Sequence, residues 1–132
     1  MSYLLDTHTF LWLVFNPSNL SSSSQEVLKD RGNRVSVSVL TFWEISLKYS
    51  LGKLILKNCT PESLVEVAKK LDLDPLELTP RDAAAFHRLP KMIHKDPFDR
   101  MIIWQAICHD LTLISRDKQF QAYQKLGLKT LW

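Results

Sequence analysis

The hydrophobic and polar positions of this chain switch repeatedly between the patterns of strands and of helices. Residues 2–5 form a short run that is apolar on both faces, as in a strand buried inside a sheet. The apolar positions within 11–15 then follow helical spacing. The same succession of strand and helix is then repeated. The β-branched stretch 35–39 is expected to be the second strand, and a helix that begins at Thr41 is expected over 41–51. Strand and helix therefore alternate from the first residues onward.

Three dipeptides mark helix starts farther along, because a Thr or Asp cap followed by proline is favoured at the first helical turn. They are Thr60-Pro61, Thr79-Pro80 and Asp96-Pro97. These dipeptides and the apolar spacing predict helices over 61–71, from residue 80 and over 97–109. The same kinds of signal predict helices over 23–29 and 118–125, and strands over 75–78, 112–115 and 129–131. Strands that alternate with helices need crossover connections, so the predicted fold is a three-layer α/β/α sandwich around a mainly parallel sheet of about five strands.

Composition narrows the class of protein. With 132 residues, 45% of them hydrophobic, residues 1–132 are predicted to form a single domain. The net charge of +3 permits nucleic-acid binding without requiring it. Cys59 and Cys108 match no zinc-site spacing, which suits reduced thiols in the cytoplasm. The most apolar run, 10–15, is too short to cross a bilayer, so we expect a cytoplasmic protein without a membrane anchor.

Four acidic residues stand beside apolar segments, where a half-buried carboxylate loses hydration. Asp6 ends the first predicted strand, Glu44 lies in the first turn of the helix after the second, Asp99 opens a late helix, and Asp117 follows the fourth strand. The carboxyl ends of parallel strands form the ligand crevice of such sheets. We therefore expect all four side chains on one rim, although they are spread along the chain.

Helix capping is the competing interpretation for these acids taken singly, because carboxylates are favoured at helix starts. Thr41-x-x-Glu44 matches a capping box, Asp96-Pro97-Phe98-Asp99 matches a cap followed by an acid in the first turn, and Asp117 precedes a helix. Asp6 follows the predicted central strand, where an ordinary core would not place an acid. The four together therefore favour a site more strongly than any one alone.

Clustered carboxylates require a compensating cation. Two of them about 4 Å apart repel by about 4 kcal/mol at an effective dielectric constant near 20. A site made of oxygen ligands suits a hard cation, so Mg²⁺ or Mn²⁺ is expected, and such ions commonly assist phosphodiester chemistry.

Four motifs surround the acids: Leu4-Leu5-Asp6-Thr7-His8, then Trp43-Glu44-Ile45-Ser46, then Asp96-Pro97-Phe98-Asp99-Arg100 with Ile102-Ile103-Trp104-Gln105-Ala106, and Leu113-Ile114-Ser115-Arg116-Asp117. In this order they resemble the PIN-domain family, and most closely the VapC-type toxins of bacterial toxin-antitoxin pairs. The resemblance implies a Mg²⁺- or Mn²⁺-dependent endoribonuclease that acts as a toxin. Its catalytic and metal-binding residues would be Asp6, Glu44, Asp99 and Asp117.

The resemblance also implies supporting residues and partners. Asp96 is either a fifth acid at the edge of the site or only the cap of the helix begun by Pro97. Ser115, where the family often has threonine, and Thr7 are expected to hydrogen-bond a carboxylate or a metal-bound water. The implied partners are an RNA substrate (tRNA, rRNA or mRNA), a VapB-type antitoxin bound near the N-terminal helices and the Trp43 helix, and a second copy in a homodimer.

Basic residues near the acids are candidates for binding the RNA backbone. Lys95, Arg100 and Arg116 are close to the acids in sequence and are expected to attract phosphates. For the basic stretch 87–95, a solvated loop is the alternative. His8 and His94 are left out of the catalytic set, because a cation that activates water makes a histidine base unnecessary.

The aromatic residues suggest packing rather than substrate contact. Five of them fall on apolar helix faces, and most are expected in the core rather than in base-stacking positions: Trp12, Phe15, Trp43, Tyr49 and Trp104.

Two other functions compete with the nuclease. A phosphatase-like hydrolase would use Asp6 as its nucleophile, but such enzymes need a second aspartate two residues on, where this chain has His8. The other alternative is a non-catalytic module that binds nucleic acid or metal with the same fold.

Overall fold

The computed structural model describes residues 1–92 and 94–132. These residues form a five-stranded sheet in which every neighbouring pair of strands is parallel, in the order β3-β2-β1-β4-β5. The strands are β1 (Ser2–Leu5), β2 (Arg34–Ser38), β3 (Asp74–Leu76), β4 (Thr112–Ile114) and β5 (Lys129–Leu131). The predicted mainly parallel sheet of about five strands is confirmed.

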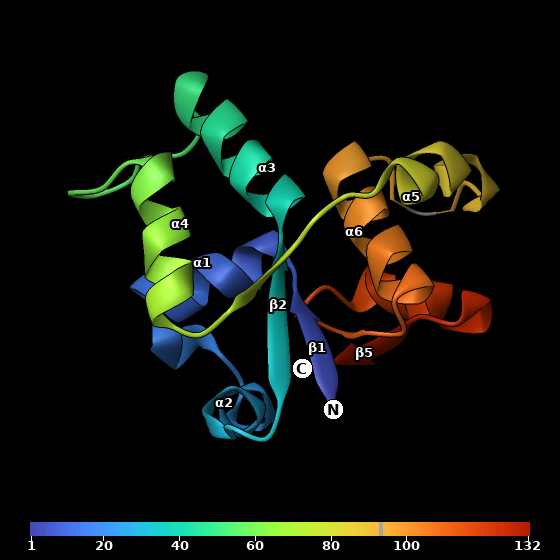
Figure 1. The fold of residues 1–132 in the computed structure, drawn as a ribbon, viewed down its shortest axis with the longest axis horizontal. Helices are drawn as coiled ribbons and strands as arrows, with labels where there is room; N and C mark the ends of the chain where they lie inside the picture. Colours follow the sequence, from blue (N-terminus) through green and yellow to red (C-terminus); the bar gives the residue numbers. More distant parts are fainter. Residues whose placement is uncertain (93) are drawn as a thin grey trace.

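Helices cover both faces of the sheet, which confirms the three-layer α/β/α prediction (Figure 1). On one side lie α1 (Thr7–Phe15), α3 (Val39–Ser50) and α4 (Pro61–Lys70), with α2 (Ser22–Lys29) below them near the start of β2, and on the other side lie α5 (Pro80–Ala85), α6 (Pro97–Cys108) and the 3₁₀ helix η3 (Lys118–Leu126). Two shorter 3₁₀ turns are η1 (Pro17–Asn19) and η2 (Phe86–Arg88). Within 1–92 and 94–132, no helix combines the length and the apolar character needed to cross a membrane.

The side chains of β1 explain why the sheet needs cover on both faces. Successive strand residues point to opposite faces, so Tyr3 and Leu5 pack on one side and Leu4 on the other. Burial of each large apolar side chain contributes about 1.5–3 kcal/mol, so both layers of helices stabilise the sheet. The first cluster also contains Phe10, Val37, Ile45 and Leu64, and the second contains Ile102, Ile103, Leu113, Phe120 and Tyr123.

The three predicted proline-associated caps are present. The side chains of Thr60, Thr79 and Asp96 each accept a hydrogen bond from a backbone N–H in the first turn of α4, α5 and α6. A proline at the first position of each helix loses nothing, because that N–H has no intrahelical partner.

Three element predictions need correction. α3 begins at Val39, not Thr41, because the hydroxyl of Ser38 caps it by accepting from the N–H of Leu40 at 3.1 Å. α2 begins at Ser22, since Ser21 rather than Ser23 is the cap. The segment 118–126 forms a 3₁₀ helix instead of an α-helix. The first correction matters most, since it places Glu44 in the second turn of α3.

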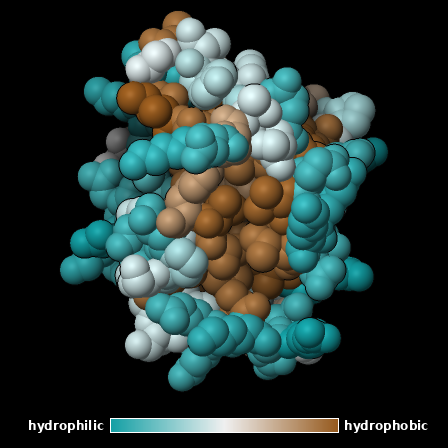
Figure 2. Space-filling view, turned by 90° about the vertical axis from the view of Figure 1, so that its left-hand side faces the viewer, coloured by the Kyte–Doolittle hydropathy of each residue, from teal (hydrophilic) through white to brown (hydrophobic). Residues whose placement is uncertain are grey.

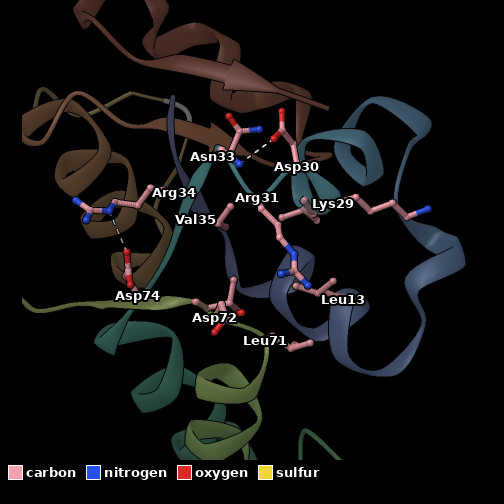
Figure 3. Close-up of a pocket in the computed structure, with 13 residues that line it drawn as sticks. Leu13, Lys29, Asp30, Arg31, Asn33, Arg34, Val35, Leu71, Asp72 and Asp74 are labelled. Carbon is pink, nitrogen blue, oxygen red and sulfur yellow. Dashed lines mark hydrogen bonds and ion pairs between the residues drawn. The ribbon is translucent and has the colours of Figure 1, made fainter.

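A cavity of about 620 Å³ lies at the amino ends of the strands (Figure 3). The turns from α2 to β2 and from α4 to β3 line it, and Arg34 pairs with Asp74 across neighbouring strands at 3.2 Å. The acids of the motifs follow the carboxyl ends of strands or lie in helices that begin beyond those ends. This cavity therefore lies at the opposite end of the strands from the acids.

Candidate active site

The order of the strands creates a crevice between β1 and β4. β1 continues toward β2 and β3 on one side, whereas β4 and β5 extend the sheet on the other side. The connections leaving the two strands therefore diverge at their carboxyl ends, which is where open parallel sheets bind ligands. Asp6 directly follows β1, and its N–H donates to the carbonyl of Ile114 at the end of β4, at 3.3 Å. The crevice thus begins at Asp6.

Asp6 is a buried acid, with only 5% of its surface exposed. Its carboxylate accepts the N–H of Thr9 at 2.8 Å and so caps α1. Burial raises the pKa of Asp6 above its ordinary value, and hydrogen bonds from Ser115 and Thr9 only partly oppose the rise. Ser115 thus lies near this carboxylate, and its Oγ also accepts the N–H of Asp117 at 3.1 Å.

Glu44 reaches the same region from α3 and is 3% exposed. Its Oε1 accepts the hydroxyl of Thr7 at 2.7 Å, and Thr7 also lies 3.2 Å from the hydroxyl of Thr41. Because Ser38 caps α3, the capping-box interpretation of Glu44 is wrong. The burial of a glutamate in the second turn of a helix therefore needs another explanation. The hydrogen bond from Thr7 places the Glu44 carboxylate near the end of β1.

Asp99 and Asp96 occupy the start of α6. Asp96 is the N-cap and accepts the N–H groups of Phe98 at 2.8 Å and Asp99 at 3.3 Å. Burial, together with the charges of Asp96 and Glu44, raises the pKa of Asp99 to about 6, and Asp6 adds to the rise. The charges of three acids, Asp96, Glu44 and Asp6, therefore all act on Asp99.

Asp117 lies on the other side of the crevice and differs from the half-buried acid expected, since 39% of its side chain is exposed. It caps η3 by accepting the N–H of Gln119 at 2.9 Å. Its other oxygen lies 3.1 Å from Nε2 of the buried His94. His94 also opposes the rise in the pKa of Asp99, so this histidine acts on both acids.

Lys48 is a site residue that the sequence reasoning missed. Its ammonium pairs with Glu44 one turn earlier on α3. The hydrogen bond to Glu44 and the charges of Glu44, Asp96 and Asp99 raise the pKa of Lys48, although burial opposes them. A Glu four residues before a Lys on one helix was the available signal. The chain thus supplies its own cation to the acidic cluster.

Comparison with known proteins identifies the family of the chain. Residues 3–126 match the sequence profile described as PIN domain. The chain belongs to the PIN domain family. A relative of known description is Ribonuclease VapC22 from Mycobacterium tuberculosis (strain ATCC 25618 / H37Rv), 24% identical over 129 residues that cover 98% of this chain and 97% of that protein.

Solved structures share the fold of this PIN domain. VapBC2 from Rickettsia felis, bound to a DNA fragment from its promoter, aligns with a TM-score of 0.69 and 16% identity over 99% of this chain and 98% of that chain. DNA-bound VapBC from Salmonella typhimurium aligns with a TM-score of 0.67 and 18% identity over 99% and 97% of the two chains.

The acids of the PIN domain do not form a ready-made metal cage. Among residues 1–92 and 94–132, no three His, Cys, Asp or Glu side chains are grouped closely enough to hold a metal ion between them. Three of the four carboxylates instead have partners of their own: Thr9 for Asp6, Thr7 and Lys48 for Glu44, and His94 for Asp117. The electrostatics nevertheless fit a divalent cation, because burial raises the pKa of Asp6, and burial together with neighbouring carboxylates raises the pKa of Asp99.

The three predicted phosphate-binding residues have different surroundings. Arg116 and Lys95 are exposed. Arg100 instead donates to the carbonyl of Leu89 at 3.1 Å and lies 4.8 Å above the ring of Phe86. These contacts give Arg100 a structural role in holding the segment before α6.

Several aromatic residues expected in the core are on the surface of the PIN domain. Trp43 is 61% exposed, and Phe15 and Tyr49 are also exposed. Trp104 is partly buried, and its indole N–H donates to the carbonyl of Asp82 at 2.9 Å. The apolar helix faces that carry Phe15, Trp43 and Tyr49 therefore do not all face the sheet.

Proposed function

We propose that this PIN domain is an endoribonuclease that depends on Mg²⁺ or Mn²⁺ and acts as the toxin of a toxin-antitoxin pair. The observation that carries the proposal is that Asp6, after β1, and Glu44, from α3, both raise the pKa of Asp99 at the start of α6. Residues so distant in sequence have no capping reason to share one region. The likeness to Ribonuclease VapC22 supports the same activity.

We assign the binding of the cation to Asp6, Glu44, Asp99 and Asp117. When bound, the cation would neutralise a phosphate, lower the pKa of a water molecule and stabilise charge on the leaving oxygen. The surrounding side chains orient the acids: Ser115 acts on Asp6, Thr7 on Glu44 and His94 on Asp117. Such partners fix the direction in which a carboxylate presents its oxygens. Arg116 and Lys95 attract the RNA backbone to the crevice.

A partner protein would bind the side of the molecule that carries α1 to α4. Figure 2 looks at this side and shows a continuous hydrophobic area framed by hydrophilic residues. Exposed apolar side chains on these elements include Phe15 of α1, Leu47 of α3, and Leu51 and Ile55 after it. Apolar areas of this kind mark interaction sites. We assign this area to a VapB-type antitoxin, and the structural relatives solved as VapBC complexes support the assignment. A homodimer is also proposed for the free toxin.

Cleavage assays with single-residue variants test the ribonuclease. The purified protein, free of any antitoxin, should cleave tRNA or rRNA fragments with Mg²⁺ or Mn²⁺ and stop on addition of EDTA. Asp6→Asn and Asp99→Asn should abolish cleavage and weaken binding of Mn²⁺ while the protein stays folded. Asp110→Asn is the matched control, because Asp110 precedes β4 at the amino end of the sheet.

The outcomes separate the alternatives. Cleavage that persists in EDTA and in both the Asp6→Asn and Asp99→Asn variants would refute the assignment of a metal-dependent ribonuclease. RNA or Mn²⁺ binding without any cleavage would make the domain a non-catalytic binding module. A covalent phosphate on Asp6 would indicate the phosphatase-like chemistry instead.

A further inference from the structure

A cleft of about 680 Å³ continues from the acidic site along the start of α1. Asp6 and Asp117 line it, together with the rings of Trp12 from α1 and Trp132 after β5. Arg116 lines the same cleft from the connection between β4 and η3. The cleft therefore joins two of the proposed catalytic acids to an aromatic wall and to a cationic side chain.

The two indoles are not stacked on each other. Their ring centroids are 5.7 Å apart, and their planes are inclined by 52°, so neither ring lies flat on the other. Both residues are only partly buried. The guanidinium carbon of Arg116 is 5.9 Å from the centroid of the Trp12 ring, within the range of a cation–π contact. Arg116 itself is exposed and can turn toward an anion.

We propose that this cleft binds an unpaired nucleobase of RNA next to the scissile phosphate. The base packs on Trp12 and Trp132, and the adjoining phosphate is held by Arg116 and by Lys118, which also lines the cleft. The inference rests on the proposed ribonuclease function and deepens it, because it names the part of the substrate that the protein grips beside the reacting bond.

The chemistry of the cleft matches a nucleotide strand. An RNA strand alternates a flat, stackable base with a negative phosphate, and the cleft offers flat rings beside two cationic side chains. Aromatic faces accept any base, so the site contributes affinity rather than a strict sequence preference. Bases inside a duplex are already stacked and paired, so the cleft favours loops and single-stranded segments.

Stacking on Trp12 requires Arg116 to move. Two flat contacts at about 3.5–4.0 Å each need roughly 7–8 Å between the ring and the guanidinium. The present separation is 5.9 Å. Because Arg116 is exposed, an outward turn toward the phosphate opens the space for the base. Base binding and phosphate binding are thereby coupled through one side chain.

Binding measurements in EDTA test the cleft without cleavage. The probes are a fluorescein-labelled single-stranded RNA of mixed sequence and a matched oligomer that has the same phosphates but abasic riboses. Trp12→Ala should weaken binding of the RNA by about 5- to 150-fold, the effect of losing one stacked base, and barely change binding of the abasic oligomer. Trp12→Phe, which keeps a flat ring, should restore most of the affinity. Arg116→Ala should weaken both oligomers, because phosphates are common to them.

Control variants and thermal melts show whether a loss of binding comes from the cleft or from unfolding of the protein. Trp132 also packs against a hydrophobic cluster of the core, so Trp12 is the safer position for substitution. Tyr49→Ala removes another exposed aromatic ring, from α3, and should bind both oligomers like the wild type. Thermal melts of each variant accompany the titrations.

The results distinguish this inference from the proposed function. The proposed base site is wrong if Trp12→Ala binds the RNA with wild-type affinity, or if its affinity for both oligomers falls by the same factor. Either result would refute the base site even if Mn²⁺-dependent cleavage persists. If the wild type cleaves no RNA while the base-dependent loss is observed, the cleft binds bases but the ribonuclease proposal fails. With both correct, Trp12→Ala also raises KM for cleavage and leaves kcat close to the wild-type value.

Discussion

At the scale of single residues, two of the acids of this PIN domain have partners from distant parts of the chain. Thr7 at the start of α1 donates to Glu44 of α3, and His94 before α6 contacts Asp117 after β4. Such contacts fix the rotamers of the carboxylates before a substrate arrives.

His94 is expected to be a positioning residue. Without it, Asp117 loses the neighbour that directs one of its oxygens, while its bond to the N–H of Gln119 remains. His94→Ala should lower kcat for RNA cleavage and the affinity for Mn²⁺ by roughly 10- to 100-fold, as loss of a partner of a metal ligand usually does. Single-turnover assays and calorimetric titration measure the two effects.

Two variants check the role of His94. His94→Gln retains an amide donor and should recover part of both losses. His87→Ala removes an exposed histidine at η2 and should behave as the wild type. Equal losses in the Ala and Gln variants would indicate that the ring only fills space beside Phe120 and Tyr123.

Asp99 predicts how stability depends on pH when no divalent cation is present. Its pKa rises from the ordinary value of 3.8 to about 6 on folding, through burial and then the charges of Asp96 and Glu44. Between these two values the folded state binds more protons than the unfolded state, so the contribution of Asp99 to stability falls as pH rises through this window. Asp6 acts in the same direction, because its pKa is also raised.

Thermal melts in EDTA across this pH window should therefore show that Asp99→Asn gains stability relative to the wild type as pH increases. Asp110→Asn is the control. Its position has φ 54°, which Asn adopts as readily as Asp, and it lies at the amino end of β4. A difference between wild type and Asp99→Asn that does not change with pH would contradict the assignment of the raised pKa.

At the scale of the helices, Asp96 combines a structural position with a charge close to the site. Its Oδ1 accepts the N–H groups of both Phe98 and Asp99, which is the geometry of an N-cap. We expect capping to be its main role. Asp96→Ala should then cost about 0.5–2 kcal/mol of unfolding free energy, whereas Asp96→Ser should keep the cap and nearly all of the stability.

Cleavage assays on the same variants decide whether Asp96 has a second role. Asp96→Ser should keep most of the ribonuclease activity. Thr60→Ala removes the cap of α4, and should lower stability by a similar amount without affecting cleavage. A folded but inactive Asp96→Ser protein would make Asp96 a fifth acid of the site.

The helices also show how far the sequence predicts this fold. Proline-associated caps are local chemistry, and the starts at Pro61, Pro80 and Pro97 were predicted correctly. The start of α3 was wrong by two residues, because Ser38 and Thr41 can both cap and Val39 favours a strand. Only packing in three dimensions decides between such alternatives.

The supporting residues of the site were harder to predict than its acids. The acids follow recognisable strands and motifs, whereas the Thr7–Glu44 bond joins residues 37 positions apart. The His94–Asp117 contact spans 23 positions. No local pattern encodes such pairs. Lys48 is different, because its spacing from Glu44 was visible in the sequence. That residues 1–132 form a single domain stays a prediction.

At the scale of the whole molecule, the two ends of the sheet and its two faces have different uses. Asp6 and Asp117 follow the carboxyl ends of β1 and β4 and line the aromatic cleft. The side with α1 to α4 carries the exposed hydrophobic area (Figures 1 and 2). Leu51 and Ile55 are 58% and 84% exposed, so they contribute little to the core. Substitutions at these two positions can therefore test the binding of a partner without destabilising the fold.

The double variant Leu51→Asp with Ile55→Asp separates the partner face from the active site. Its unfolding free energy should stay within about 0.5 kcal/mol of the wild type, because surface substitutions rarely cost more. RNA cleavage by the isolated protein should be unchanged, but a VapB-type antitoxin should no longer inhibit it, since charges would replace the apolar contact. Lys69→Asp, an exposed charge change on α4, should leave inhibition intact. Full inhibition of the double variant would move the antitoxin to another surface, and lost cleavage in the absence of antitoxin would mean that this face also supports the active site.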